Sequence, residues 1–451
     1  MKHVSKLMML SAATLMALSL VGCGGTPADP GTDDPGTDDP GTDEPVVDNS
    51  VPGIIKQAEA MDKETLYKKA MEEINGKTFT VVANSSRMKD AAPAWAKFCQ
   101  TNYDANFNFT FVTSQPKNNR IFTQIKADVT GSNHVIAMTL IQDGNQIKNK
   151  MIDTGYLLNY IPKEWDGNKA NDGEPLALQS LNKVFVYNNL GTKKFNNCWD
   201  FVSEGFHTQF MAPNSEPVGK NFLYMLTRDD YAKVVKDAYL AYTGDKTYFE
   251  TALKAVDGLE SEFGLSADAK YSLAWIYLWQ KSFLEVEDDG PISSNLVKKS
   301  SPDAAGLLVY SKFRSTSETE ETSNKNVTVA AYQDGYQGFG GYMYKHYLQL
   351  TKTSPYPWTS CALINFMTTE KDGFAPWGKD MGGYSSSPAV QMKFDHSKDG
   401  FVDGVDTYPV KNDRGYDWWT ANEAGKGRLV LEDSVYAAKV SADLGDWIDS
   451  L

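Results

Sequence analysis

Three short apolar runs alternate with two helical stretches early in the chain, and this order restricts the fold more than any single motif does. The runs cover 79–83, 107–114 and 134–143, and the stretches between them, 91–103 and 120–129, are predicted to be helices. Such alternation is typical of a parallel sheet covered by helices. Ligands bind these sheets at the carboxyl ends of the strands. Those ends carry a polar set, which is Ser85, Ser86, Arg87, Thr113, Ser114, Gln142 and Asp143.

The middle of the chain repeats the alternation with new sequence. An extended run is predicted at 183–189, and apolar residues recur at helical spacing in 231–242 and 249–263. The stretch 271–279 is apolar all round, which predicts a buried helix. The stretch 306–314 is predicted to be a strand that ends in polar and basic groups.

The first residues are typical of a secretory signal. Lys2 and Lys6 precede an almost wholly apolar run over 7–21, which is too short for a comfortable membrane span. The tetrapeptide Leu-Val-Gly-Cys that ends at Cys23 resembles a bacterial lipobox. This resemblance implies a signal peptide over 1–22, cleavage before Cys23 and a lipid on its sulfur, so the protein is expected to be lipid-anchored on the cell surface or periplasmic face of a bacterial membrane. The alternative is an ordinary secreted protein with a chance cysteine.

A repeat follows the lipobox. Asp-Pro-Gly-Thr-Asp occurs three times over 29–43, and Pro, Gly and repelling acids keep such a segment extended and solvated. Residues 23–53 are therefore predicted to be a flexible tether of about 30 Å average length. An Asp-rich metal trap is the alternative, but Pro and Thr interrupt the acids. The folded part is expected to begin with an amphipathic helix over 54–74.

Charge and motif content exclude several classes of protein. The net charge of −14 disfavours nucleic acid as a partner. The sequence has no H-E-x-x-H, G-x-S-x-G or P-loop motif, so we expect no enzyme activity, no cofactor and no metal site. Cys99, Cys198 and Cys361 cannot all pair; one disulfide or three isolated buried thiols are both open.

The ordered set of elements resembles one family. Over about residues 60–390 the chain is similar to extracellular solute-binding proteins of ABC importers, of the two-lobed kind that includes iron, polyamine, thiamine and phosphonate binders. The stretches that carry the resemblance are LYKKAMEEINGKTFTVVANSSR, DTGYLLNYIP, NNCWDFVSEGFHTQFMAPNSEPVGKNFLYMLT and SPYPWTSCALINFMTTEKDGFAPWGKDMGGYSSSP. In such proteins the Trp199–Asp200 segment leads into the second lobe, and the helix Pro357–Thr369 belongs to a late return segment.

The resemblance implies a fold and a division of the chain. The fold is α/β, a two-lobed periplasmic-binding-protein-like fold of type II, in which each lobe is a mostly parallel sheet flanked by helices and crossing strands join the lobes. The expected parts are the first part of lobe 1 (54–184), lobe 2 (185–328), a return segment mainly in lobe 1 (329–390) and a C-terminal extension packed on the body (391–451). The lobes would close over a small-molecule or ion solute, and the monomer would then dock on the ABC permease subunits.

If both lobes present strand ends to one cleft, a set of ligand-binding residues follows. One wall is expected to offer Ser85, Ser86, Arg87, Gln142 and Asp143. The other is expected to offer Asn214, Ser215, Tyr310, Lys312 and Arg314, with Asp334 and Tyr336 near the hinge. For each residue the alternative is a loop side chain that bonds its own backbone.

The identity of the solute stays open at this point. Iron binders of this superfamily use adjacent tyrosines, and the corresponding position here offers Tyr310 followed by Ser311, which departs from that pattern. Tyr342, Tyr344 and His346 alternate on a predicted strand, a pattern that packing explains more often.

The charges on the predicted walls favour neither sign. The basic residues of the walls suit an anion, whereas Asp143 and Asp334 suit an amine. Iron, a polyamine, a phosphorylated compound and a sugar all remain candidates.

Two other interpretations of the function are open. The 10 Trp and 23 Tyr suggest a surface carbohydrate-binding or glycan-hydrolysing lipoprotein, but hydrolysis needs two carboxylates facing one cleft, and the sequence nominates no such pair. An adhesin or structural protein is the third possible function.

The segment 395–406 nearly satisfies the spacing of a calcium-binding loop. Asp406 replaces the bidentate Glu of such loops, so a turn-rich acidic loop is the alternative.

Overall fold

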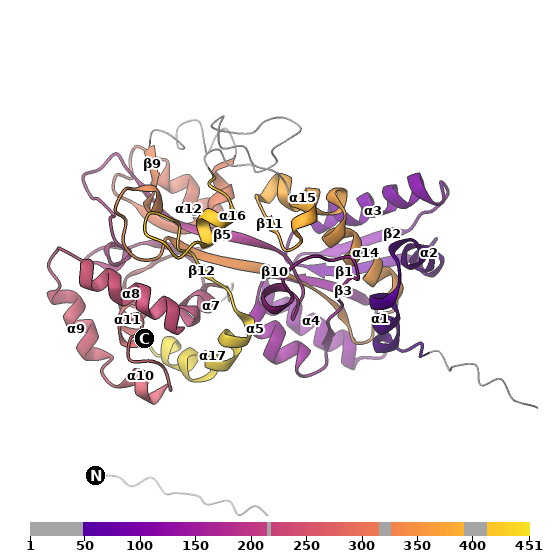
Figure 1. Ribbon diagram of the computed structural model, residues 1–451, viewed down its shortest axis with the longest axis horizontal. Coiled ribbons are helices and arrows are strands. Elements are labelled where there is room, and N and C mark those ends of the chain that lie inside the picture. Colours follow the sequence, from indigo (N-terminus) through magenta and orange to yellow (C-terminus); the bar gives the residue numbers. More distant parts are fainter. Residues whose placement is uncertain (1–47, 214–217, 315–325, 392–412) are drawn as a thin grey trace, which may run out of the picture. The chain divides into compact units, whose positions relative to one another are not determined.

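The computed structural model describes residues 48–213, 218–314, 326–391 and 413–451 (Figure 1). The lipobox, residues 23–47 of the predicted tether, Asn214, Ser215 and the calcium-like segment 395–406 lie outside the described residues. Residues 48–53, the end of the predicted tether, are described, and a helix begins within them at Val51, so the folded part starts earlier than expected. Within the described residues, no helix combines the length and the apolar character needed to cross a membrane.

The first half of the sheet has the predicted alternation. Strand β1 (Thr78–Ala83) lies between β2 (Thr110–Ser114) and β3 (Ile136–Ile141), and all three strands are parallel. Helix α3 (Met88–Asn102) connects the first two strands and α4 (Asn118–Thr130) connects the next two. We call the half built on β1–β3 lobe 1.

The predicted helix over 54–74 is two helices, α1 (Val51–Ala60) and α2 (Lys63–Ile74). The break occurs because Asp62 is extended and its carboxylate accepts the backbone N–H of Thr65 at 2.9 Å, which caps α2. Both helices pack against α14 (Pro357–Thr369), which returns from far along the chain and is buried over nearly its whole length. A helix was predicted over the same residues, and its assignment to a return segment stays a prediction.

Two long strands join the halves of the sheet. Strands β5 (Ala177–Asn188) and β10 (Gly341–Thr351) pair antiparallel, and every residue of both is buried. The strand order is β2-β1-β3-β10-β5-β8-β6-β7, so β10 adjoins β3 and β5 adjoins β8 (Figure 1). Gly341 is required at the start of β10, because a Cβ there would lie 2.1 Å from the carbonyl oxygen of Lys183. β5 and β10 are the crossing strands.

The second half of the sheet is also parallel. Strand β6 (Gln209–Met211) pairs with β7 (Leu284–Val286) and β8 (Ala305–Val309), and we call this half lobe 2. Its helices are α7 (Val218–Met225), α8 (Asp229–Ala241), α9 (Thr247–Ala255), α10 (Leu259–Glu262), α11 (Ala269–Ser282) and α12 (Asp289–Leu296).

Two of the helices predicted from the sequence can be compared with the structure here. The predicted helix over 249–263 divides into α9 and α10 at Gly258, whose φ of 86° is left-handed. Helix α11 is buried as predicted, and Trp275 stacks on Trp279 at 5.0 Å between ring centroids.

Each lobe has its own hydrophobic core. The core of lobe 2 gathers around β8, α7 and α11. Lobe 1 gathers its main core around β1, α2, α3 and α14, and a smaller cluster around α4 and β3. Separate cores on two parallel half-sheets, joined by crossing strands, confirm the predicted two-lobed α/β fold. The lobe boundaries drawn from the sequence stay a prediction.

The described C-terminal residues pack on both lobes. β12 (Val430–Leu431) pairs with β10 in parallel, and α16 (Tyr416–Thr420) precedes it. Helix α17 (Ser434–Asp449) contacts α7 of lobe 2 and, in lobe 1, α5 (Gly144–Gln146) and the π-helical turn η1 (Ile147–Ile152) (Figure 1). This segment therefore bridges the lobes beside the crossing strands.

A buried hydrogen-bond network lies at this bridge. The side-chain amide of Asn221, on α7, donates to Asp143 at 2.9 Å and to Glu432 at 3.1 Å. Glu432 also accepts the backbone N–H of Lys345 and the hydroxyl of Tyr347, both at 2.9 Å. Lobe 1, lobe 2, β10 and the C-terminal segment thus share one network.

The remaining elements are short, apart from α15. They are β4 (Leu157–Leu158), α6 (Lys169–Asp172), η2 (Cys198–Val202), η3 (Tyr310–Arg314), β9 (Val327–Val329), η5 (Ala330–Tyr332), α15 (Lys371–Met381), β11 (Tyr384–Ser385) and η6 (Pro388–Val390). Cys99, Cys198 and Cys361 are buried free thiols, so no disulfide joins them.

Candidate functional site

A cavity of about 360 Å³ lies where the carboxyl ends of the parallel strands of both lobes meet. Lobe 1 lines it with the residues that follow β1, β2 and β3, which are Asn84, Ser85, Ser86, Arg87, Gln115, Pro116, Lys117 and Gln142. Lobe 2 lines it with the residues at the ends of β6, β7 and β8, which are Met211, Asp288, Asp289, Val309, Ser311 and Lys312. The crossing strands contribute Lys183 and Tyr344.

The wall from lobe 1 is built by the turn between β1 and α3. The hydroxyl of Ser85 accepts the backbone N–H of Arg87 at 3.3 Å, and α3 begins at the next residue. The guanidinium of Arg87 lies 3.7 Å from Asp90, one turn along the helix. The turn therefore holds a cation at the edge of the cavity.

A buried ion pair forms part of the cavity lining. The ammonium of Lys183, on β5, donates to both carboxylate oxygens of Asp289, at 2.8 and 2.6 Å. The two side chains are only 3% and 9% exposed. Asp289 is the first residue of α12, where the helix dipole favours a negative charge. The ring centroid of Tyr344 lies 5.6 Å from the same ammonium.

The wall from lobe 2 carries a looser ion pair. The ammonium of Lys312 lies 3.7 Å from the carboxylate of Asp288, and these side chains are 32% and 53% exposed. Burial raises the pKa of Asp288, but the charge of Lys312 and the backbone N–H of Asp289 outweigh it, so the pKa lies below its usual value. Asp288 is thus held in the ionised form.

Five of the predicted ligand-binding residues line this cavity. They are Ser85, Ser86, Arg87, Gln142 and Lys312. Their role in binding a solute stays a prediction.

Asp143 does not line the cavity, although it follows β3 directly. Its side chain caps α5 by accepting the backbone N–H of Gln146, and it is wholly buried beside Asn221. Burial raises the pKa of this carboxyl group. The side chain lies in the bridge network, so it is not available to the cavity.

Tyr310 is also placed elsewhere, because β8 ends at Val309 and the chain turns into η3. The ring of Tyr310 is buried and packs edge-on against Trp419 at 6.0 Å between centroids. The predicted strand over 306–314 therefore ends earlier than expected. The side chain of Arg314 lies outside what the structure describes.

The two residues predicted near the hinge do not reach the cavity. The hydroxyl of Tyr336 donates to the carbonyl of Phe339 at 2.9 Å, and the ring is buried in the core of lobe 2. Asp334 is exposed in the preceding turn.

Sequence reasoning missed Lys117, Lys183, Asp288, Asp289 and Tyr344. The signal for Lys183 was a single lysine at the start of an apolar run, a position where a charge needs a partner. The two aspartates follow β7, a three-residue strand that the sequence analysis did not predict. Tyr344 was interpreted as packing.

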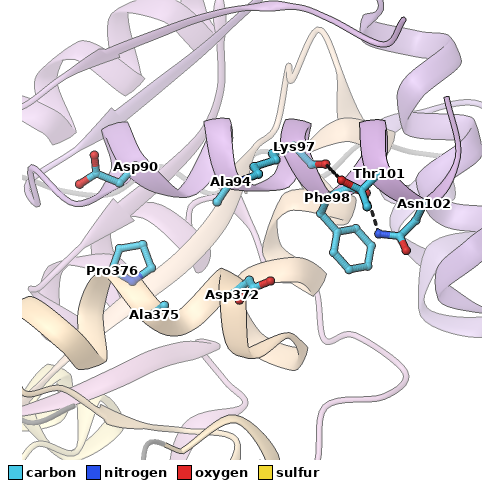
Figure 2. A pocket seen from close by; sticks show the side chains of 9 residues that line it. All are labelled: Asp90, Ala94, Lys97, Phe98, Thr101, Asn102, Asp372, Ala375 and Pro376. Atoms are coloured by element: carbon cyan, nitrogen blue, oxygen red, sulfur yellow. Dashed lines mark hydrogen bonds between the residues drawn. The ribbon is translucent and has the colours of Figure 1, made fainter. Parts of the chain in front are cut away.

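A second hollow of about 460 Å³ lies between α3 and α15, within lobe 1 (Figure 2). Its lining mixes the apolar Phe98 and Pro376 with polar side chains. Two of these, Thr101 and Asn102, bond back to carbonyls of their own helix, at 2.9 and 2.8 Å. All of its residues belong to one lobe, so movement of the lobes would not enclose a ligand there.

Metal binding has no support among the described side chains. No group of three His, Cys, Asp or Glu residues in the described ranges is close enough to hold an ion. His346 is buried against Gln179 at 2.8 Å, and burial lowers its pKa to about 3.

The chain was compared with known proteins. No protein-family model matches it, and no curated protein matches it. Solved structures that resemble it include the Bordetella ferric binding protein (11% identity, TM-score 0.49, 83% of this chain and 98% of that one). A second is the Streptococcus pneumoniae spermidine/putrescine ABC transporter substrate-binding protein (12% identity, TM-score 0.47, 83% of this chain and 99% of that one). A third is an ABC transporter substrate-binding protein from Agrobacterium tumefaciens (12% identity, TM-score 0.45, 70% of this chain and 81% of that one). The strand order and the two cores remain the basis for the fold described above.

Proposed function

We propose that the protein captures a small solute in the cavity between its lobes and delivers it to the permease of an ABC importer. The observation that carries this proposal is that residues from both lobes form the walls of the cavity. Three parallel strand ends of each lobe meet there, and the crossing strands link the lobes. Closure of two domains around a ligand is a common way to bury a solute and to signal that it is bound. We expect the protein to act as a monomer and to bind no nucleic acid.

The described residues of the cavity do not favour hydrolysis, the alternative function. Among the described residues, the acids that line it are Asp288 and Asp289, which are adjacent in sequence, and Asp289 is held by both oxygens on Lys183. A pair of carboxylates that flank a glycosidic bond must act as acid and base or nucleophile. A carboxylate fixed in a buried ion pair is poorly suited to either role.

Solute capture predicts a measurable compaction. The purified protein should bind one solute per chain by calorimetry, and its radius of gyration from small-angle scattering should fall when the solute is added. Lys298→Gln, a substitution outside the cavity lining, should compact to the same extent and serves as the control. Turnover of a bound compound, lost when Asp288 or Asp289 is replaced, would instead place the protein among the enzymes.

The lipobox resemblance supports a membrane anchor, which forms part of the same proposal. Cys23→Ser should move the protein from the membrane fraction to the soluble fraction without changing its affinity for the solute, because the predicted tether separates Cys23 in sequence from the described residues that line the cavity. Fractionation followed by immunoblotting measures this, with Cys99→Ser as the control. Membrane retention of the Cys23→Ser protein would contradict the anchor.

A further inference from the structure

Two buried acids share one hydrogen-bond donor where the lobes meet. The side-chain nitrogen of Asn221 donates to Asp143 at 2.9 Å and to Glu432 at 3.1 Å, so the two acceptor oxygens are no more than about 6 Å apart. The side chains of Asp143 and Glu432 are 0% and 2% exposed. Two negative charges this close in a buried place repel each other strongly, so we expect the pair to hold a proton.

The three residues belong to different parts of the fold. Asp143 follows β3 in lobe 1, and Asn221 lies on α7 in lobe 2. Glu432 follows β12 in the C-terminal segment, whose helix α17 packs against α7, α5 and η1 (Figure 1). If lobe 2 turned away from lobe 1, the hydrogen bond between Asn221 and Asp143 would break. The network is therefore a contact between the lobes in addition to the crossing strands.

The cations that act on the acid pair do not cancel the effect of burial. Lys150, on η1, attracts Asp143, and Lys345, on β10, attracts Glu432. The ammonium of Lys345 lies 2.9 Å from the carboxylate of Asp172, so its charge is largely engaged there. Burial exceeds both attractions and raises the pKa of Asp143 and of Glu432 above their usual values.

The other ionisable groups around the pair are tyrosines and the acids of α17. The tyrosines are Tyr224 on α7 and Tyr342 and Tyr347 on β10. Burial raises the pKa of all three hydroxyls, so they stay neutral near pH 7. Helix α17 adds Asp446 and Asp449, whose charges act on Tyr224. Of these described groups, the acid pair is the one that titrates near neutral pH.

We propose that this network is a pH-sensitive latch between the lobes, which holds them together while the acid pair keeps a proton and releases them when both acids ionise. Loss of the proton places a second negative charge on the same amide donor. Separation of the lobes relieves the repulsion, because it moves Asn221 away from Asp143 and lets water reach both acids. The inference goes beyond the proposed function, since it concerns the protein without a solute.

The direction of the pH effect follows from the same geometry. The pKa of Glu432 is raised to about 7 by burial and by the charge of Asp143. Below this pH the pair keeps its proton and the latch is closed, whereas above it the second charge appears and the latch opens. The midpoint of the change is therefore expected near neutral pH.

The test measures the radius of gyration of the full protein by small-angle scattering from pH 5 to pH 8, with no solute added. The wild type should expand as the pH rises, with a midpoint near pH 7, and should compact again when the pH is lowered. Circular dichroism should stay constant, because the lobes separate without unfolding.

Two substitutions each imitate a protonated acid and should abolish the expansion. Glu432→Gln keeps the shape of the side chain and removes its charge, so the radius should stay at its low-pH value. Asp143→Asn removes the partner charge and should have the same effect. The matched controls are Glu423→Gln and Asp443→Asn, which change exposed acids of the C-terminal segment and should expand like the wild type.

Three results would overturn the latch. One is a wild-type radius that does not change between pH 5 and pH 8, a measurement that needs no substitution and therefore decides even if a variant fails to fold. Another is an unchanged expansion in both Glu432→Gln and Asp143→Asn proteins that melt like the wild type, since other groups would then titrate. The third is an expansion with loss of circular dichroism, which is unfolding. None of these results bears on solute capture, which is measured by adding a solute at one pH.

Discussion

Replacing Lys183 by methionine is expected to destabilise the protein by about 3–5 kcal/mol, the cost of leaving a buried charge without its partner. Asp289 would keep its carboxylate in the cavity lining with its side chain 9% exposed, after losing both hydrogen bonds from the ammonium. Urea unfolding followed by fluorescence measures the change through the midpoint. Stability equal to that of the wild type would show that water reaches Asp289 and that the pair contributes nothing.

The double variant Lys183→Met with Asp289→Leu is the matched control for this experiment. Replacing both members of a buried ion pair by apolar residues of similar size is often neutral or stabilising. The double variant should therefore recover most of the lost stability. It also separates structure from binding, since a stable double variant that binds solute poorly would show that the pair contributes to the cavity itself.

The second large effect is a fall in stability with rising pH that depends on Glu432. Burial, together with the charge of Asp143, raises the pKa of Glu432 from 4.5 to about 7, against the backbone N–H of Lys345 and the hydroxyl of Tyr347, which lower it. The folded protein therefore holds this proton more tightly than the unfolded chain does. The stabilisation is complete below about pH 4.5 and is lost as the pH rises through about 7, a total of about 3 kcal/mol.

Glu432→Gln removes the titrating group and keeps its shape. Unfolding free energies measured from pH 5 to pH 8 should fall less steeply in this variant than in the wild type. Asp143 contributes to the remaining slope, because burial raises its pKa as well. Glu423→Gln changes an exposed glutamate and should leave the wild-type profile intact. Identical profiles for the Glu432→Gln and wild-type proteins would show that Glu432 does not take up the proton.

The sequence predicted the layout of the sheet better than the direction of individual side chains. Alternating apolar runs and helical stretches were enough to place β1, β2 and β3, and to place the cavity at their carboxyl ends, because chain direction follows from the order of elements. Ser85, Ser86 and Arg87 lie at a strand end in any register. The prediction that they lie beside the cavity therefore did not depend on the exact register of the strand.

Side chains at turns were harder to predict. Asp143 caps a three-residue helix and Tyr310 begins a 3₁₀ turn, so a change of local backbone turns both away from the cavity. Strand periodicity does not report where a strand gives way to such a turn. The ion pair of Lys183 and Asp289 could not be predicted for another reason. Their pairing joins residues 106 positions apart, and no pattern in a single sequence links them.

Because the chain passes between the lobes more than once, neither lobe can complete its core from early residues alone. Lobe 1 packs its core around α14, and lobe 2 includes Trp419, Leu444 and Ile448 in its core. Both cores therefore lack central side chains until segments far along the sequence are present. During synthesis the early strands are made long before the helix that covers them, so neither core can be completed until late in synthesis. If the protein is exported, as the proposed membrane anchor requires, such late closure would leave the chain unfolded until it has crossed the membrane.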